Sequence, residues 1–453
     1  MIDTPKRLFV ILSSIYKPKG KSLFRFATSP TGDMHIDNLR VALFSYICAT
    51  QADDKLLIRI EDTDQKQNIP GKDQEILEIL SLFGITYSDV TYQSHNLKFH
   101  QQLATKLLMD KNAFSCFCTP EMIDADRANA EANNTTYQYN GICENLSDDQ
   151  VLNNESPFSV RVKRPNTDIE FTDKIKGKMH FSKNVIDSYI ILRVDKSPTY
   201  NFACAIDDLL GDISMVIRAE DDISNTPKQI MIRDYLGYDK EVLYAHLPTI
   251  LNDAGKKMNK DDEAFSVTWL LEEGFLPSAI ANYLIMIGNK TATKIFDISE
   301  ALEWFDLASV SKAPAKFDIA KLRQINREHI NRLAPLELAK FIGYSSKDLG
   351  ELAKIYTEEG STINEIKPKI DAIFSKKEPS EFQEEFATLS KVAKEAPYFK
   401  EFDDFEAHLE NVSGLKEEQL FKPLRFLLTK AENGPDLSKV YPHIRNYLGE
   451  IIK

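Results

Sequence analysis

Residues 23–84 constrain the fold more than any other part of the chain, because strand-like and helix-like patterns alternate there. Leu23–Ala27 and Lys55–Ile60 are short apolar runs that predict strands, and His35–Ala52 and Pro70–Gly84 have the apolar spacing of amphipathic helices. Strand, helix, strand and helix in this order predict a parallel α/β domain. Ligands of such sheets bind at the carboxyl ends of the strands. We therefore expect functional side chains directly after each strand.

The same patterns divide the remainder of the chain. From about residue 114 to 190 the alternation is interrupted by a cysteine cluster, a polar stretch and short β-type runs, which indicates an insertion. The alternation resumes with a strand in Ser188–Val194, a helix in Thr199–Leu210 and a strand in Ile213–Arg218. From about Leu322 to Lys453 the pattern predicts helices throughout. The sequence thus predicts an α/β part followed by an all-α part.

Composition and charge argue against several classes of protein. The chain has 453 residues, 43% of them hydrophobic, so it can bury a sizeable core. Its net charge of −13 argues against a nucleic-acid binder that relies on bulk charge, but not against one with a local basic face. No apolar run approaches the roughly 18 residues of a membrane span. Gly20-Lys21-Ser22 is preceded by Ile15 where a phosphate loop needs its first glycine, so we do not expect a P-loop NTPase.

The first 22 residues need a separate interpretation. Lys6-Arg7, followed by the apolar run Leu8–Tyr16, has the outline of an export signal, but no small-residue cleavage site follows it. We therefore favour an additional strand, or a start codon placed too early, over secretion.

Three of the five cysteines, Cys116, Cys118 and Cys143, fall within 28 residues. Five cysteines in a chain of this length do not make a disulfide scaffold, so the cluster indicates a possible metal site in a reducing compartment. The alternative is that Cys116 and Cys118 alternate on a strand as small hydrophobic residues.

Three polar clusters could carry chemistry. Arg25–Asn38 places hydroxyl groups, backbone N–H groups and His35 at the start of a helix, where phosphates are attracted, although an ordinary strand–helix turn has the same outline. Arg59–Asp64 has three carboxylates that could bind an ammonium group or Mg²⁺, or cap a helix, and Glu61 is the best functional candidate among them. Gly255–Lys260 has three lysines, which form either a solvated loop or a phosphate clamp.

Together with three further motifs, these clusters resemble the bacterial-type glutamyl-tRNA synthetases, which are class I aminoacyl-tRNA synthetases. The further motifs are Pro198–Phe202, Ile217–Asp221 and Ser224–Gln229. The order and spacing match over nearly the whole chain, apart from about the first 20 residues. The details look most like the second glutamyl-tRNA synthetase of bacteria that carry two.

The resemblance implies a fold and a domain division. It implies a Rossmann-like parallel-sheet catalytic domain with an inserted acceptor-binding subdomain, followed by an all-α anticodon-binding domain. The implied segments are an N-terminal extension (1–22), the first catalytic half (23–113), the acceptor-stem subdomain (114–190), the second catalytic half (191–255), the signature-lysine loop with a stem-contact region (256–321) and the anticodon-binding domain (322–453).

The resemblance also implies an activity, which is the ATP- and Mg²⁺-dependent ligation of L-glutamate to tRNA through a glutamyl-adenylate. It assigns the triphosphate to His35, Lys257 and Lys260, with further ATP contacts from Thr31, Gly32 and Asn38. It assigns glutamate to Arg25, Ala27, Ser29, Glu61, Tyr200 and Arg218, and a structural zinc ion to Cys116, Cys118, Tyr139 and Cys143. A substrate with two carboxylates and one ammonium group suits two guanidinium forks and one acid. We expect a cytoplasmic monomer that does not bind membranes.

Three aspartates depart from the family pattern. Asp37 stands in place of a glycine, Asp261 in place of an arginine and Asp222 in place of a histidine. A like charge about 4 Å from a phosphate costs about 4 kcal/mol at an effective dielectric constant of about 20. A paralogue that binds tRNA or glutamate without efficient adenylation is therefore the alternative to an active ligase. The intact glutamate set and both signature lysines favour the ligase, and the helical part argues against the short relative that modifies a queuosine base.

Overall fold

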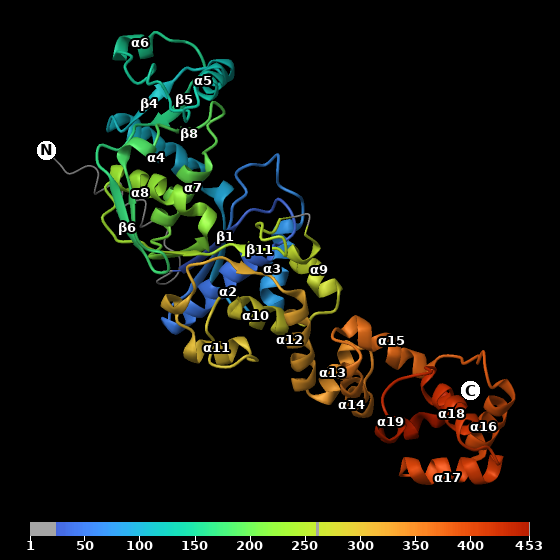
Figure 1. Ribbon diagram of the computed structural model, residues 1–453. Helices are drawn as coiled ribbons and strands as arrows, with labels where there is room; N and C mark the ends of the chain where they lie inside the picture. The colour runs from blue at the N-terminus through green and yellow to red at the C-terminus, as the bar shows by residue number, and fades with distance from the viewer. Residues whose placement is uncertain (1–23, 260–261, 453) are drawn as a thin grey trace. The chain divides into compact units, whose positions relative to one another are not determined.

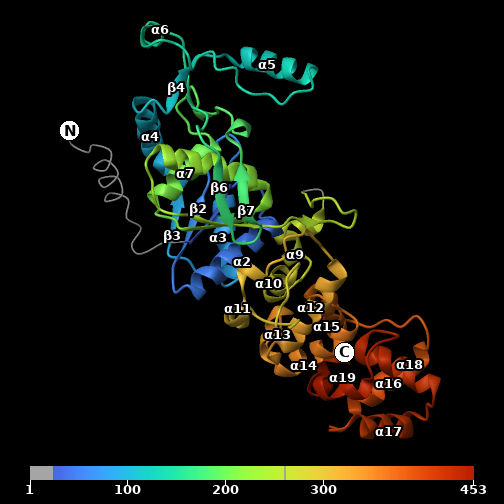
Figure 2. The same cartoon turned by 60° about the vertical axis from the view of Figure 1, so that its left-hand side comes forward.

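The computed structural model describes residues 24–259 and 262–452. The predicted extension at 1–22, and with it Lys260 and Asp261, therefore lies outside the described residues. The chain forms two compact units (Figures 1 and 2). The first unit holds the described residues up to Val267, with Leu284–Ala292 and Ile298–Phe317, and the second holds Thr268–Tyr283, Thr293–Asp297 and the residues from Asp318 onward.

A seven-stranded sheet forms the centre of the first unit, in the order β3-β2-β1-β9-β10-β6-β7. Its strands are β1 (Phe24–Thr28), β2 (Leu56–Ile60), β3 (Asp89–Tyr92), β6 (Ile169–Asp173), β7 (Gly177–Phe181), β9 (Met215–Ala219) and β10 (Leu243–Leu247). All neighbouring strands run parallel except β6 and β7. The predicted parallel α/β fold is therefore confirmed.

Strand register brings two of the predicted polar clusters and the motif Ile217–Asp221 to one edge of this sheet. Thr28, the last residue of β1, is paired with Ile60, the last residue of β2. On the other side, Arg25 in β1 is paired with Val216 in β9, and Arg218 in β9 with His246 in β10. The segments that follow β1, β2 and β9 therefore start side by side, as the ends of parallel strands do.

Helices of the first unit pack through apolar faces. The helices are α2 (Ile36–Gln51), α3 (Lys72–Leu82), α4 (Leu97–Met109), α5 (Pro120–Ala132), α6 (Asp148–Leu152), α7 (Tyr200–Leu210), α8 (Thr226–Tyr235) and α11 (Ile298–Trp304). Along α2, Leu39, Leu43 and Ile47 recur at helical spacing and are completely buried. The apolar sides of α4, α7 and α8 share one core, which includes Phe202 and Ile232. The helices predicted after the first two strands are confirmed.

The stretch predicted as an insertion contributes to two sheets. The strands β4 (Ala113–Cys116), β5 (Ser159–Val162) and β8 (Ile190–Leu192) form a separate antiparallel sheet. The β6–β7 hairpin instead extends the main sheet, where Asp173 is paired with Tyr244 of β10. A short parallel pair, β11 (Ile250–Leu251) with β12 (Ala315–Lys316), completes the first unit.

Helices make up the second unit throughout residues 318–452, as the sequence predicts. They are α12 (Ile319–Arg332), α13 (Pro335–Phe341), α14 (Lys347–Ile355), α15 (Ile363–Phe374), α16 (Gln383–Glu395), α17 (Phe402–Ser413), α18 (Glu418–Thr429), α19 (Leu437–Ile444) and α20 (Leu448–Ile451). Two more helices, α9 (Val267–Glu272) and α10 (Pro277–Met286), run from one unit's residues into the other's. Gly350 allows α13 and α14 to approach, because a Cβ atom there would lie 1.7 Å from the carbonyl oxygen of Pro335. Among the described helices, none is long and apolar enough to cross a membrane.

Candidate active site

Two buried arginines share one aspartate beneath the carboxyl edge of the sheet. Arg25 of β1 donates from Nε to Asp208 Oδ1 at 3.2 Å, and Arg59 of β2 donates from Nη1 to the same oxygen at 2.5 Å. Burial, the largest single effect, acts to lower the pKa of both guanidinium groups, but the effects of Asp208 and Glu61 together outweigh it and the pKa values are raised. The two arginines in turn hold the pKa of Asp208 well below its usual value, against the effect of burial. A substrate carboxylate at Arg25 would therefore meet a guanidinium that already has a counter-charge.

Glu61 directly follows β2, as predicted, and lies beside this cluster. Its Oε1 atom accepts from Arg59 Nη2 at 3.1 Å and from the Cys204 thiol at 3.1 Å. A weaker contact from Arg59 Nε, at 3.3 Å, ends on the same oxygen. Because these contacts fall on Oε1, Oε2 is the oxygen with capacity for another donor.

Arg218 at the end of β9 is held in a different way, because its partners are neutral. Its Nη1 donates to Gln229 Oε1 at 3.0 Å, and its Nη2 donates to the Thr226 hydroxyl at 2.6 Å. Its Nε donates to His246 Nε2 at 3.1 Å. The side chain is only 5% exposed. A buried guanidinium without a carboxylate partner among these contacts favours an anionic ligand.

Tyr200, the first residue of α7, lies within electrostatic range of both Glu61 and Arg218. Its hydroxyl donates to Asp222 Oδ1 at 3.3 Å, and Asp222 also accepts from Asn225 at 2.9 Å. Desolvation raises the pKa of Tyr200, the negative charges of Glu61 and Asp222 raise it further, and Arg218 acts to lower it. Glu61, Tyr200 and Arg218 are therefore electrostatic neighbours, as the predicted glutamate set requires.

The triphosphate candidate His35 lies at the start of α2, within electrostatic range of Lys257. His35 is the residue before this helix, and its ring lies 4.1 Å from the ring of Phe265. Burial lowers the pKa of His35; Lys257 acts in the same direction, and Asp33 opposes both. Lys257 forms an ion pair with Asp221, and both side chains are about half exposed. The structure therefore brings His35 and Lys257 together, while Lys260 lies outside the described residues.

Asp37, one of the departures from the family pattern, lies in the first turn of α2. Burial raises its pKa to about 6, while the positive charges of Arg40 and Lys257 act to lower it and Glu220 adds to the increase. Asp37 thus lies within electrostatic range of a signature lysine. Its negative charge at neutral pH is offset in part by that lysine.

The remaining predicted ligand-binding residues lie in or next to the loop that joins β1 to α2. Ser29 and Thr31 are exposed, and Ala27 and Gly32 are half-buried. Asn38 in α2 donates to the Thr28 hydroxyl at 3.1 Å and so ties the helix to the end of β1. A Cβ atom at Gly32 would have no neighbour within 4 Å, so no described protein group requires glycine there.

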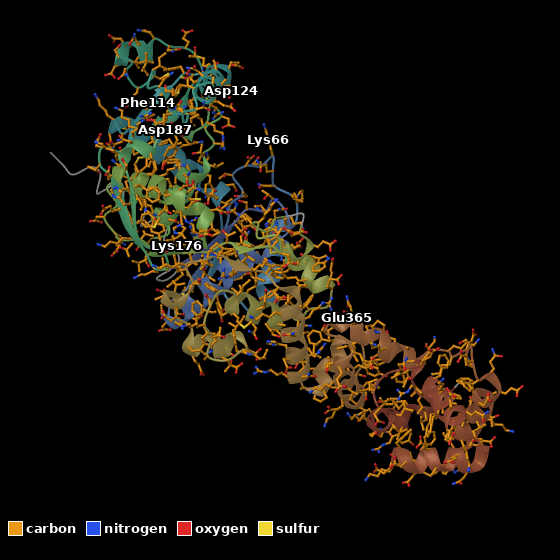
Figure 3. All side chains as sticks on the ribbon, in the orientation of Figure 1. Lys66, Phe114, Asp124, Lys176, Asp187 and Glu365 are labelled. Atoms are coloured by element: carbon orange, nitrogen blue, oxygen red, sulfur yellow. The ribbon has the colours of Figure 1, made fainter. Side chains whose placement is uncertain are left out.

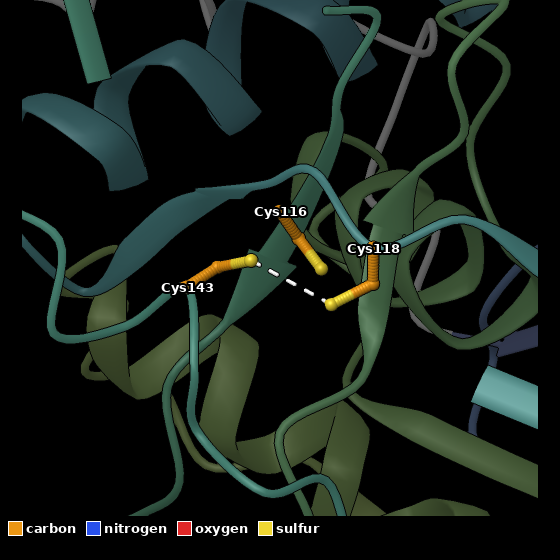
Figure 4. A group of neighbouring side chains, drawn as sticks. All are labelled: Cys116, Cys118 and Cys143. Carbon is orange, nitrogen blue, oxygen red and sulfur yellow. Dashed lines mark hydrogen bonds between the residues drawn. The ribbon is translucent and has the colours of Figure 1, made fainter. Parts of the chain in front are cut away.

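The cysteine cluster is a compact group at the end of β4 (Figure 4). Its three sulfur atoms lie within 4.8 Å of one another, and the sulfur atoms of Cys118 and Cys143 are 3.6 Å apart. The Tyr139 hydroxyl lies 3.7 Å from the Cys116 sulfur and 3.6 Å from the Cys118 sulfur. Ligands about 2.3 Å from a tetrahedral zinc ion are about 3.7 Å apart, so this donor set fits such an ion.

Tyr139 is held in place from outside the cluster by two residues labelled in Figure 3. Its backbone N–H donates to Asp187 at 2.8 Å, and its ring stacks on Phe114 at 6.0 Å between centroids. The Arg161 guanidinium lies over the same ring, 4.0 Å from its centroid. The phenol is therefore positioned by the protein itself, as an orienting shell around a metal ligand would require.

Sequence reasoning missed the residues that hold the predicted ones. They are Asp208 between the two arginines and His246 beside Arg218; Thr226 and Gln229, the other partners of Arg218, lie in the motif Ser224–Gln229, to which the sequence assigned no separate role. One signal was visible for Asp208, because Asp207-Asp208 is a pair of acids inside an otherwise apolar helix. No local pattern marks His246, whose role depends on the pairing of β9 with β10.

Comparison with known proteins gives the family. Residues 22–324 match the family described as tRNA synthetases class I (E and Q), catalytic domain. Glutamate–tRNA ligase 2 of Sulfurimonas denitrificans is 56% identical over 432 residues, which are 95% of this chain and 100% of that protein. Glutamate–tRNA ligase 1 of Nitratiruptor sp. is 55% identical over the same shares. Glutamate–tRNA ligase 1 of Campylobacter jejuni is 52% identical over 431 residues, with the same coverage.

Solved structures agree with the sequence matches. A glutamate tRNA ligase from Elizabethkingia meningosepticum, crystallised in complex with its amino acid, aligns with a TM-score of 0.80 at 26% identity. The alignment covers 96% of this chain and 98% of that one. The glutamate-tRNA synthetase from Elizabethkingia anophelis aligns with a TM-score of 0.78 at the same identity. The sequence resemblance is therefore confirmed, and the chain belongs to the class I tRNA synthetases (E and Q).

Proposed function

We propose that this protein ligates L-glutamate to tRNA with ATP and Mg²⁺, through a glutamyl-adenylate. The observation that carries the proposal is Arg218, a buried guanidinium whose hydrogen-bond partners are the neutral groups of Thr226, Gln229 and His246 and which, like Glu61, lies within electrostatic range of Tyr200. Such a group selects an anionic side chain. The curated relatives, which are named glutamate–tRNA ligases, support the same assignment.

Each charged group of the glutamate substrate has its own partner in the proposed pocket. Arg218 binds the side-chain carboxylate of the substrate, and Glu61 Oε2 accepts from its ammonium group. Arg25 takes the second carboxylate only through the part of its guanidinium that Asp208 leaves open, so it contributes less than Arg218. Tyr200, Ser29 and Ala27 complete the walls.

Adenylation joins this pocket to the start of α2. The α-carboxylate attacks the α-phosphorus of ATP in line, and pyrophosphate leaves. His35, Lys257 and Lys260 stabilise the charge that develops on the phosphates, and Thr31, Gly32 and Asn38 border the nucleotide. Mg²⁺ bound to ATP supplies charge neutralisation. A terminal ribose hydroxyl of tRNA then attacks the glutamyl carbonyl carbon, an ester forms, and AMP leaves.

The remaining segments contact the tRNA. Residues 114–190 bind the acceptor stem, 256–321 contact the stem and 322–453 bind the anticodon, as the resemblance implies. Cys116, Cys118, Cys143 and Tyr139 hold a structural zinc ion that stabilises the end of β4. A closed site of this kind contributes folding energy to a segment with little core of its own.

Charging of tRNA tests the proposal directly. The purified full chain should attach labelled glutamate to tRNA-Glu, to tRNA-Gln or to both when ATP and Mg²⁺ are present. The side-by-side comparison also decides which of the two tRNAs is used. If neither tRNA is charged at high enzyme concentration, the ligase assignment is wrong and the non-adenylating paralogue takes its place.

Metal analysis tests the zinc site. Protein prepared without chelator should contain about one zinc ion per chain, because the four donors match a closed tetrahedral site. The double variant Cys116→Ser/Cys118→Ser should lose the metal. The control Cys48→Ser removes a cysteine of α2 that lies outside the cluster and should retain it. If the wild-type protein contains no zinc, the zinc assignment is wrong and the cysteines are small hydrophobic residues.

Asp37 should affect ATP binding in a pH-dependent way. Its raised pKa of about 6 means that the side chain is charged above that pH and neutral below it. Asp37→Asn removes the charge without changing the shape, so the KM for ATP should fall at pH 8 and change little at pH 5.5. Asp37→Gly, which restores the residue typical of the family, should act in the same direction. An Asp37→Asn variant within about twofold of wild type at both pH values would mean that the charge does not reach the triphosphate.

A further inference from the structure

The contacts of Arg218 lead to a second layer of residues that the glutamate set does not include. His246 of β10 is completely buried and accepts from Arg218 Nε through its Nε2 atom, at 3.1 Å. Its other ring nitrogen, Nδ1, lies 2.6 Å from Asp173 Oδ2 at the end of β6. Asp173 is 2% exposed and accepts the backbone N–H groups of Ile175 and Lys176 on its other oxygen. The Arg218 guanidinium, the His246 imidazole and the Asp173 carboxylate thus form one buried series of hydrogen bonds.

The order of donors and acceptors in this hydrogen-bonded series determines which ring nitrogen of His246 carries the proton. A guanidinium has only donors, so Nε2 of His246 must be an acceptor and cannot carry a proton. The proton then lies on Nδ1 and is donated to Asp173, which has only acceptors when ionised. Burial lowers the pKa of His246 and Arg218 acts in the same direction, against the effects of Asp173 and Asp222. The neutral ring is therefore the form that this arrangement favours.

The histidine also acts as a spacer between two opposite charges. Arg25 and Arg59 contact the carboxylate of Asp208 directly, and Arg59 also pairs with Glu61, so two carboxylates balance the two guanidinium charges. Arg218 is separated from the carboxylate of Asp173 by the width of an imidazole ring, so its charge stays available to a ligand. The Thr226 hydroxyl, within 3.0 Å of His246 Nε2, and Gln229 hold the same guanidinium without adding charge.

We propose that His246, oriented by Asp173, is a positioning residue that aims Arg218 and separates it from the carboxylate of Asp173, and that it thereby sets the preference for a substrate with an anionic side chain. The proposal rests on the proposed function, in which Arg218 binds the side-chain carboxylate of glutamate. It adds a specificity role for a pair of residues, on β10 and β6, that do not line the glutamate pocket themselves.

Three substitutions at His246 separate this role from simple support of the fold. His246→Asn retains a polar side chain but is too short to accept from Arg218, so the KM for glutamate should rise about 10- to 100-fold while the KM for ATP stays within about twofold. His246→Gln places an amide oxygen near the position of Nε2 and should restore part of the loss. His246→Glu places a carboxylate against Arg218 and so reduces the preference for an anionic side chain. Glutamine should therefore compete with glutamate more effectively in this variant than in the wild type.

A matched control comes from the second unit. His329 is also buried and shares a hydrogen bond with Asn282 at 2.9 Å. His329→Asn should lower the thermal stability of the protein and leave the KM for glutamate unchanged. Thermal unfolding of every variant distinguishes folded from unfolded preparations, and if His246→Asn does not fold, His246→Gln is compared with wild type instead.

The outcomes distinguish this inference from the proposed function. If wild type charges tRNA and the His246 variants raise the KM for glutamate and for ATP by the same factor, or raise neither, the positioning role is wrong and the ligase assignment stands. If wild type charges no tRNA, the ligase assignment fails, and calorimetric titration with glutamate replaces the kinetic readout.

In that titration, weaker glutamate binding by His246→Asn, restored in part by His246→Gln, would support the inference. Absence of glutamate binding to wild type, or equal glutamate binding by wild type, His246→Asn and His246→Gln, would overturn the inference.

Discussion

Arg218→Met is expected to lower kcat/KM for glutamate by about 10²- to 10⁴-fold, because breaking a buried charge pair costs about 3–5 kcal/mol. Methionine fills a similar volume but leaves the substrate carboxylate without a counter-charge, and leaves Thr226, Gln229 and His246 without their shared donor. The measurement is the rate of tRNA charging at varied glutamate concentration. The KM for ATP should change little, since the triphosphate candidate His35 lies at the start of α2 and is not among the contacts of Arg218.

Two controls accompany this variant. Arg218→Lys keeps the charge but loses the planar fork, so its activity should fall between that of Arg218→Met and wild type. Arg323→Met removes a guanidinium that pairs with Glu365 at 2.6 Å on a partly exposed surface of the second unit, and should change kcat/KM for glutamate by less than about threefold. An Arg218→Met enzyme with nearly normal kcat/KM would show that the side-chain carboxylate is bound elsewhere.

Asp208→Asn is expected to destabilise the first unit by about 3–5 kcal/mol. The substitution keeps the shape of the side chain but leaves Arg25 and Arg59 buried without their shared counter-charge. The measurement is the midpoint of urea unfolding of that unit, followed by a probe such as the near-ultraviolet signal of its tyrosines. The control Asp110→Asn breaks a pair with Lys106 one helical turn away, which is partly exposed, and should cost less than about 0.5 kcal/mol.

The Asp208 carboxylate also makes the free energy of unfolding of the first unit fall as the pH is lowered. Because the pKa of Asp208 is lower in the folded protein than in the unfolded chain, its contribution is present above the unfolded value of about 3.9. That contribution is lost as the pH falls from there toward the folded pKa. Wild type should therefore lose more stability than Asp208→Asn between pH 5 and pH 3. Parallel curves for the two proteins would contradict a depressed pKa.

Local sequence patterns were sufficient for the order of the elements and for the position of several site residues. The apolar spacing of β1, α2 and β2 predicts strand, helix and strand, and parallel topology alone implies that Ser29 and Glu61 lie at one edge of the sheet. The spacing of Cys116, Cys118 and Cys143 likewise predicts one cluster. These inferences succeed because each depends on periodicity or on residues close together in the chain.

The partners of the charged groups were decided by the tertiary structure alone. Asp208 reaches Arg25 across 183 positions of the sequence, and His246 reaches Arg218 only because β10 pairs with β9 in one register. The β6–β7 hairpin, inside a stretch that resembles an insertion, joins the main sheet and brings Asp173 to His246. Composition and local pattern show which side chains carry charge. Whether a buried guanidinium is neutralised or left for a substrate depends on strand register and helix packing, which bring together groups that no local pattern relates.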